Sequence, residues 1–141
     1  MTTRRYLVLI EDDDDDAELL RLTLRRQNIT NELIRFGDGE SALEYLFAPD
    51  TALPEFIMLD LKLPRMDGFE VLKRLRANNR TTLIPIFVFT SSDSDVDRVT
   101  SLQLGIEGYI RKSEPPRLGQ DIIKVVHNSG IWTTWTRRRV E

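Results

Sequence analysis

Short, continuous apolar runs constrain the fold of this chain more than any other feature. The clearest are Tyr6–Ile10, Phe56–Leu59 and Ile84–Phe89, and each has the length of a β-strand. Strands that are buried on both faces of a parallel sheet are runs of this kind. Leu33–Phe36 is interrupted by a charge, as an edge strand is, and Glu107–Ile110 is the weakest strand candidate.

Between these runs, apolar residues recur at the spacing of an amphipathic helix. The five stretches are Leu19–Leu24, Ala42–Phe47, Phe69–Leu75, Val96–Leu104 and Leu118–Val126. Strand and helix candidates therefore alternate along the chain, which favours a parallel sheet with right-handed crossovers and helices on both faces. We predict an α/β fold with a doubly wound, five-stranded parallel sheet and five helices.

The chain length fits one domain that buries most of its apolar surface. Of the 141 residues, we assign 1–129 to this domain and 130–141 to a C-terminal tail that carries Trp132 and Trp135. These two tryptophans either contribute to a dimer interface or fold back onto the same domain.

The composition excludes several classes of function. Without cysteine the chain has no disulfide framework and no thiolate metal site, and a single histidine excludes a histidine-rich one. The net charge of −3 gives no indication of nucleic-acid binding. The apolar runs are too short for a signal peptide or a membrane span, so we expect a cytoplasmic protein.

Polar residues follow the strand candidates. Glu11 and Asp12 come after the first apolar run, Asp60 after the third, Thr90 after the fourth and Lys112 after the fifth. Ligands of an open parallel sheet bind beyond the carboxyl ends of its strands. We therefore predict that three carboxylates, a hydroxyl and an ammonium meet at one edge of the sheet.

The expected site is rich in oxygen ligands. Clustered carboxylates repel one another unless a cation or a proton lies between them. Oxygen ligands favour a hard cation, Mg²⁺ or Mn²⁺, and Mg²⁺ prefers one or two carboxylates together with a phosphate oxygen. An aspartate is also a nucleophile towards phosphoryl groups, whose oxygens a metal, a lysine and a hydroxyl then stabilise.

Each of these residues also has a simpler explanation. The acidic run Asp13–Asp16 is typical of a solvated helix start, an interpretation that we adopt for its last three members and leave open for Asp13. Taken singly, Asp60 could be a turn residue, Thr90 a helix N-cap and Lys112 a surface charge. Their joint placement at successive strand ends favours the functional interpretation.

Four motifs at these positions resemble the receiver domains of two-component response regulators. They are Val8–Asp12, Met58–Gly68, Val88–Ser92 and Gly108–Lys112, and the resemblance extends over about residues 5–127. Four motifs in the right order and at the usual spacing make a specific signal. The resemblance implies the flavodoxin-like, CheY-like strand order 2-1-3-4-5.

The resemblance also assigns a metal site and a phosphoacceptor. It implies that Asp60 accepts a phosphoryl group from a sensor histidine kinase. Asp12 and Asp60 would ligate Mg²⁺ directly, together with the backbone carbonyl of Lys62. Glu11 would act on the metal through water.

By the same resemblance, Lys112 and Thr90 contact the phosphoryl oxygens. Thr90 would be pulled inward while Tyr109 turns from an exposed to a buried position, which couples the phosphate to a distant surface. The alternative is that Tyr109 is a half-buried strand aromatic with no switching role. One departure concerns Ser113, which stands where receivers usually have a proline, often in a cis peptide. A trans bond, the normal form before serine, would aim Lys112 differently.

A finer resemblance is to single-domain regulators that are paired with bacterial phytochrome kinases. It rests on Asp15–Leu20, Leu63–Gly68 and Ile131–Trp135. It implies a bacteriophytochrome as the kinase and a homodimer that forms through the fourth helix, the fifth strand, the fifth helix and the tail.

We therefore expect a single-domain response regulator, a signalling phosphoacceptor that promotes its own phosphorylation and dephosphorylation and is not an enzyme. An aspartate-dependent phosphohydrolase would need a second acid two residues after its nucleophile, where Lys62 stands. A phosphate-independent interaction module that retains the fold is the remaining alternative.

Overall fold

Five parallel strands form the sheet at the centre of the molecule. The computed structural model describes residues 6–130 and contains β1 (Tyr6–Ile10), β2 (Glu32–Phe36), β3 (Phe56–Leu59), β4 (Ile86–Thr90) and β5 (Gly108–Arg111). Their order is β2-β1-β3-β4-β5, and every neighbouring pair is parallel. The predicted α/β fold and its strand order are confirmed.

A helix follows each strand, and the five are α1 (Asp14–Arg26), α2 (Gly39–Phe47), α3 (Gly68–Ala77), α4 (Asp95–Gln103) and α5 (Arg117–Asn128). Four begin after a residue whose side chain accepts a hydrogen bond from a free backbone N–H of the first turn. These N-caps are Asp13, Asp38, Asp67 and Ser94. Asp13, whose role the sequence left open, therefore caps α1, and Ser94 rather than Thr90 caps α4.

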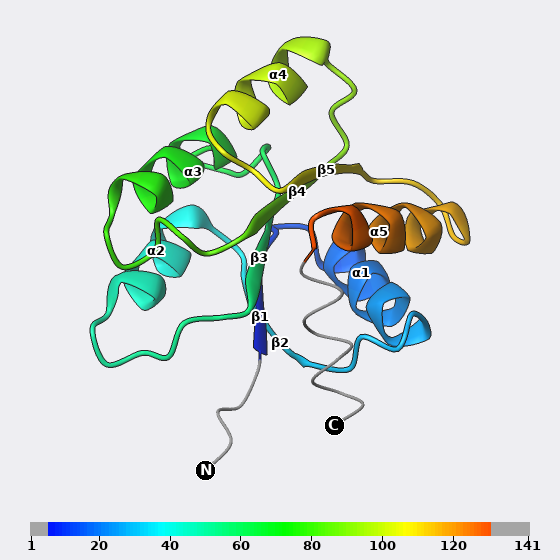
Figure 1. Cartoon of the computed structure of the whole chain (residues 1–141), viewed down its shortest axis with the longest axis horizontal. Helices are drawn as coiled ribbons and strands as arrows, with labels where there is room; N and C mark the ends of the chain where they lie inside the picture. Colours follow the sequence, from blue (N-terminus) through cyan, green and yellow to red (C-terminus); the bar gives the residue numbers. More distant parts are fainter. Residues whose placement is uncertain (1–5, 131–141) are drawn as a thin grey trace.

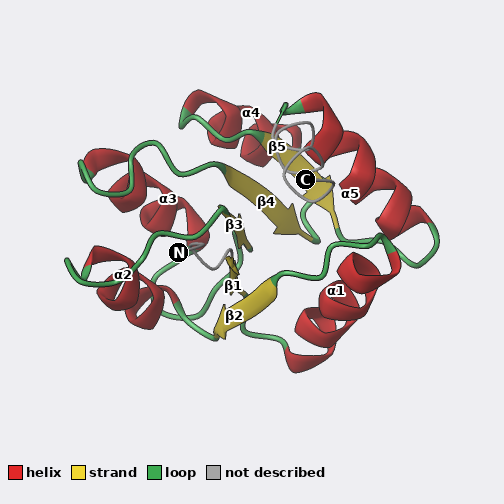
Figure 2. Ribbon diagram, turned by 60° about the horizontal axis from the view of Figure 1, so that its bottom comes forward, coloured by secondary structure: helices red, strands yellow, loops and turns green. Residues whose placement is uncertain are grey.

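Two hydrophobic clusters cover the two faces of the sheet. Leu7 and Leu9 of β1 belong to the cluster that includes α1 and α5, whereas Val8 and Ile10 belong to the cluster that includes α2 and α3. Figures 1 and 2 show these two pairs of helices on opposite sides of the sheet. Because successive side chains of a strand point to opposite faces, a strand between two helical layers is apolar throughout.

Helix α4 buries fewer of its residues than the other helices do. Val96, Val99 and Leu102 mark this helix in the sequence, yet 73%, 51% and 50% of their respective surfaces are exposed. Ser101 is the buried residue of α4, and Leu104 packs against the cluster of α2 and α3. The helix forms where the spacing predicts it, but most of its apolar residues face away from the core.

No helix within residues 6–130 is long and apolar enough to cross a membrane. Trp132 and Trp135 lie outside the described residues, so the assignment of residues 130–141 as a tail stays a prediction.

Candidate functional site

Four strands deliver the predicted site residues to one edge of the sheet. Glu11 directly follows β1, Asp60 directly follows β3, Thr90 ends β4 and Lys112 directly follows β5. Ile10 of β1 pairs with Leu59 of β3, and the Asp60 N–H donates to the Ile10 carbonyl at 3.0 Å. Since all the strands run in the same direction, their carboxyl ends carry these residues to the same side of the molecule.

Three carboxylates form a cluster at this edge. One oxygen from each of Glu11, Asp12 and Asp60 lies within 4.8 Å of the other two. Glu11 and Asp60 are buried, whereas Asp12 is exposed and leaves the cluster open to solvent on its side. A set of carboxylate oxygens with one open side fits a hard divalent cation that keeps some of its water.

The Lys112 ammonium lies against two of these carboxylates and against a third acid, Asp16. Its Nζ is 2.7 Å from Glu11 Oε1, 2.9 Å from Asp60 Oδ2 and 2.8 Å from Asp16 Oδ2. The Nζ also lies 5.4 Å from the centre of the Phe89 ring, where a cation is attracted to the aromatic face. Within the described residues, the cis peptide bond joins Pro115 to Pro116. The bond between Lys112 and Ser113 is therefore trans, and Lys112 still reaches the carboxylates.

Burial and charge shift the pKa values of this cluster. Burial raises the pKa of Glu11 to about 7, and the nearby Asp60 charge adds to the rise while the hydrogen bond from Lys112 opposes it. Burial lowers the pKa of Lys112, but hydrogen bonds to Asp16, Glu11 and Asp60 outweigh it and raise the pKa above its ordinary value. The lysine is therefore a permanent cation, and the pocket favours further positive charge.

The loop after β3 holds the Asp60 side chain. The Lys62 N–H donates to Asp60 Oδ1 at 3.0 Å, and the Gly68 N–H donates to the Leu61 carbonyl at 2.9 Å. A Cβ on Gly68 would overlap the Asp60 carbonyl, so the start of α3 can pack this closely only with glycine. The predicted role of the Lys62 carbonyl as a metal ligand stays a prediction.

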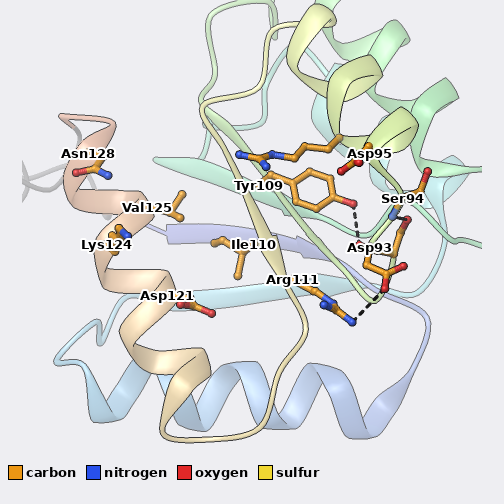
Figure 3. A pocket seen from close by; sticks show the side chains of 12 residues that line it. Asp93, Ser94, Asp95, Tyr109, Ile110, Arg111, Asp121, Lys124, Val125 and Asn128 are labelled. Atoms are coloured by element: carbon orange, nitrogen blue, oxygen red, sulfur yellow. Dashed lines mark hydrogen bonds and ion pairs between the residues drawn. The ribbon is translucent and has the colours of Figure 1, made fainter.

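Thr90 and Tyr109 meet at the loop after β4. Thr90 is fully buried, and its Oγ1 accepts a hydrogen bond from the Ser92 N–H at 3.3 Å. Tyr109 is half-buried, and its hydroxyl donates to the Ser92 carbonyl at 3.0 Å. Figure 3 shows this hydroxyl pointing towards the loop that carries Asp93 and Ser94. The two predicted switch residues are therefore both hydrogen-bonded to Ser92, while their movement stays a prediction.

Three residues near the site have contacts that the sequence did not indicate. Asp16 binds Lys112, and Arg35 of β2 donates from Nε to the Glu11 carbonyl at 2.9 Å and from Nη1 to Asp14 Oδ1 at 2.6 Å. Our interpretation of Asp14 and Asp16 as solvated helix-start residues is therefore incomplete.

Comparison with known proteins identifies the family. The chain matches the model of the response regulator receiver domain over residues 7–124. The chain belongs to this family. Its sheet order is the one that the resemblance implied.

Proteins associated with phytochromes are among the relatives of this receiver. The response regulator Rcp1 from Synechocystis sp. is 33% identical over 135 residues, which cover 93% of this chain and 88% of Rcp1. The phosphorylated cyanobacterial phytochrome response regulator RcpA is 28% identical with a TM-score of 0.78, over 89% of this chain and 93% of RcpA. The bacteriophytochrome response regulator RtBRR is 34% identical with a TM-score of 0.79, over 91% of this chain and 79% of RtBRR. The predicted likeness to phytochrome-associated regulators is confirmed.

Proposed function

We propose that this receiver accepts a phosphoryl group on Asp60 from a sensor histidine kinase, in a reaction that depends on Mg²⁺. The observation that carries the proposal is the Asp60 carboxylate, which is buried between the Lys112 ammonium at 2.9 Å and the carboxylates of Glu11 and Asp12. In this reaction an Asp60 oxygen bonds to phosphorus as the phosphorus–nitrogen bond of the phosphohistidine breaks. The electron pair of the broken bond stays on the imidazole.

The groups around Asp60 are suited to this transfer. Lys62 N–H holds one carboxylate oxygen and Lys112 the other, so the carboxylate is fixed before the donor arrives. Lys112, together with the Thr90 hydroxyl after its inward movement, would stabilise the negative oxygens of the phosphoryl group. Lys62 stands where a phosphohydrolase has its second acid. The protein therefore acts as a phosphoacceptor that promotes its own phosphorylation and dephosphorylation, and not as a multiple-turnover enzyme.

A divalent cation would be held directly by Asp12, Asp60 and the Lys62 carbonyl, and by Glu11 through water. When bound, it neutralises the carboxylates and the incoming phosphoryl oxygens. Mg²⁺ suits the all-oxygen ligands and the exposed side of Asp12, and Mn²⁺ has the same ligand preferences. The relative Rcp1 has a solved Mn²⁺-bound form, at 31% identity and a TM-score of 0.75, over 93% of this chain and 94% of the Rcp1 chain.

Labelling with a small phosphodonor tests the proposal. We expect acetyl phosphate and Mg²⁺ to add one phosphoryl group, detected by intact mass, to the wild type and none to Asp60→Asn, which keeps the fold. A wild type that is not labelled would support a phosphate-independent module. Rapid, repeated release of phosphate without an adduct would support a phosphohydrolase instead. Label retained on Asp60→Asn would refute the assignment of Asp60.

The relatives named above support a bacteriophytochrome as the kinase partner. We expect a phosphorylated bacteriophytochrome kinase to transfer its label to Asp60 within minutes, and a kinase with an unrelated sensor to do so far more slowly. Equal rates from both kinases would remove the support for this pairing.

We further propose that α4, β5, α5 and residues 130–141 form a homodimer interface. Residues of α4, β5 and α5, together with the loop before α4, line a hollow of about 390 Å³ in which acids such as Asp93 and Asp121 lie beside Arg111 and Lys124 (Figure 3). A surface with both signs of charge and the exposed Val96 and Val99 suits an isologous contact with a second copy.

Sedimentation equilibrium tests the dimer. We expect Val99→Asp to shift the protein towards the monomer. Leu83→Asp also changes an exposed apolar residue, but it lies in the loop between α3 and β4 and should leave the dimer intact. Removal of residues 131–141 separates the two roles of the tail, because a dimer that persists unchanged would place the tryptophans outside the interface.

A further inference from the structure

Asp16 is the member of the acidic run that reaches the functional site. It is the third residue of α1, and 38% of its side-chain surface is exposed, whereas the side chain of Lys112 is exposed by 15%. The two residues lie 96 positions apart in the sequence, and their side chains meet at 2.8 Å. A contact that is partly shielded from water is screened less than an ion pair on the open surface.

The three carboxylates around Lys112 have different roles in the proposed reaction. An ammonium has three N–H donors, and three carboxylates surround the Lys112 Nζ. Glu11 and Asp60 also belong to the three-carboxylate cluster that fits a cation, and Asp60 is the proposed phosphoacceptor. Asp16 lies outside that cluster, so it keeps its contact with Lys112 when the other two engage a cation or a phosphoryl group.

The helix geometry gives a second reason for an acid at this place. The amino-terminal end of a helix carries a partial positive charge, which repels a lysine ammonium that lies beside it. Asp16 is in the first turn of α1 and presents a negative charge between that helix end and the ammonium. Without it, Lys112 would lose a charge-assisted hydrogen bond and face a repulsive helix end.

We propose that Asp16 is a positioning residue that keeps the Lys112 ammonium aimed at the phosphoryl site while Glu11 and Asp60 change partners. The proposal rests on the phosphoacceptor function proposed above and adds a carboxylate outside the metal cluster to that reaction. Asp16 acts through Lys112 and does not itself touch the phosphoryl group.

The contact itself is tested without any phosphorylation, by nitrogen-15 NMR of the lysine ammonium groups. The Lys112 signal, assigned by its loss in Lys112→Ala, is expected to shift in Asp16→Ala with Mg²⁺ present. The matched control is Asp15→Ala, which removes the same charge from the neighbouring, exposed position and leaves the signal in place. An unchanged Lys112 signal in Asp16→Ala would overturn the proposal, whether or not Asp60 accepts phosphate.

The effect on the reaction is tested by the rate of Asp60 labelling with acetyl phosphate at saturating Mg²⁺. We expect Asp16→Ala to slow labelling about tenfold, which is less than the loss that a misplacement of about 1 Å can cause. Asp16→Asn keeps an oxygen that accepts a hydrogen bond but loses the negative charge, so it is expected to recover part of the rate. Asp15→Ala is expected to label at the wild-type rate.

A double-variant cycle shows whether Asp16 acts through Lys112. In a Lys112→Ala background, Asp16→Ala is expected to cause no further loss, because the group that it positions is absent. The same tenfold loss in both backgrounds, or a wild-type rate for Asp16→Ala, would refute the positioning role. If the wild type is not labelled at all, the proposed function fails, and the NMR experiment still decides the contact.

Discussion

Gly68 limits how the Asp60 backbone can be packed. A methyl group at this position would overlap the Asp60 carbonyl and the Leu61 Cα. We expect Gly68→Ala to lower the free energy of unfolding by about 1–3 kcal/mol, the usual cost of overpacking a buried site, and to slow the labelling of Asp60. Gly37→Ala is the matched control, because a Cβ there meets nothing within 4 Å. Equal stability of the two variants in urea unfolding would contradict this account of Gly68.

The buried Glu11 carboxyl predicts a pH dependence of stability in the metal-free protein. Burial raises the pKa of this group to about 7 in the folded state, above its ordinary value of 4.5. Between these two values the folded state binds the proton more tightly than the unfolded state, so stability falls as the pH rises. We expect Glu11 to contribute a loss of roughly 3 kcal/mol from below pH 4.5 to above pH 7.

Urea unfolding at a series of pH values, in EDTA, measures this contribution by comparison with Glu11→Gln, which cannot ionise. The difference in slope between the wild type and the variant should be largest between pH 5 and about pH 7. Parallel curves across this window would show that the Glu11 pKa is not raised in the folded state.

At the residue level, the sequence predicted the acids and the lysine because they directly follow strands. Glu11, Asp60 and Lys112 each stand immediately after a strand, where the topology alone brings them together. Asp16 and Arg35 could not be found in this way, because one is inside a helix and the other inside a strand. Their contacts depend on side-chain directions that the whole fold determines.

At the level of elements, burial on both faces decided which strands were recognisable. β1, β3 and β4 are buried at every position, and apart from Thr90 at the end of β4 their sequences are unbroken apolar runs. β5 has one buried residue of four, so its sequence carries little strand signal. For α4, spacing predicted the helix but not its orientation, because apolar residues on a surface and in a core have the same period.

Strand β2 anchors the loop between β1 and α1. Arg35 donates to the Glu11 carbonyl and to Asp14, so one side chain holds both ends of the segment that carries Asp12. Arg35→Lys keeps the charge but loses the fork that reaches two acceptors. We expect its Mg²⁺ affinity, measured by calorimetry, to fall about tenfold, as when a residue that supports a metal ligand is lost.

The control for this prediction is Arg26→Lys in the last turn of α1, an exposed position outside the site. Its affinity for Mg²⁺ should equal that of the wild type. An equal affinity in Arg35→Lys would mean that the loop around Asp12 holds its shape without β2.

The molecule as a whole concentrates buried negative charge at one edge of its sheet. Glu11 and Asp60 are exposed by 0% and 3%, and Lys112 is within 3 Å of both. Burying carboxylates without a partner is costly, so the stability of the metal-free protein depends on this lysine. A divalent cation in the same cluster would take over that neutralising role, so stability, metal binding and the lysine are linked.

Lys112→Met tests this linkage across the molecule. Methionine keeps the apolar stem but removes the ammonium, so in EDTA we expect the free energy of unfolding to fall by about 3 kcal/mol, as when one partner of a buried ion pair is removed. In excess Mg²⁺ most of this loss should disappear, because a cation that binds the folded state stabilises it by mass action. Lys73→Met, at an exposed position of α3, should be nearly neutral in both conditions. The same loss for Lys112→Met with and without Mg²⁺ would show that the lysine and the metal do not neutralise the same carboxylates.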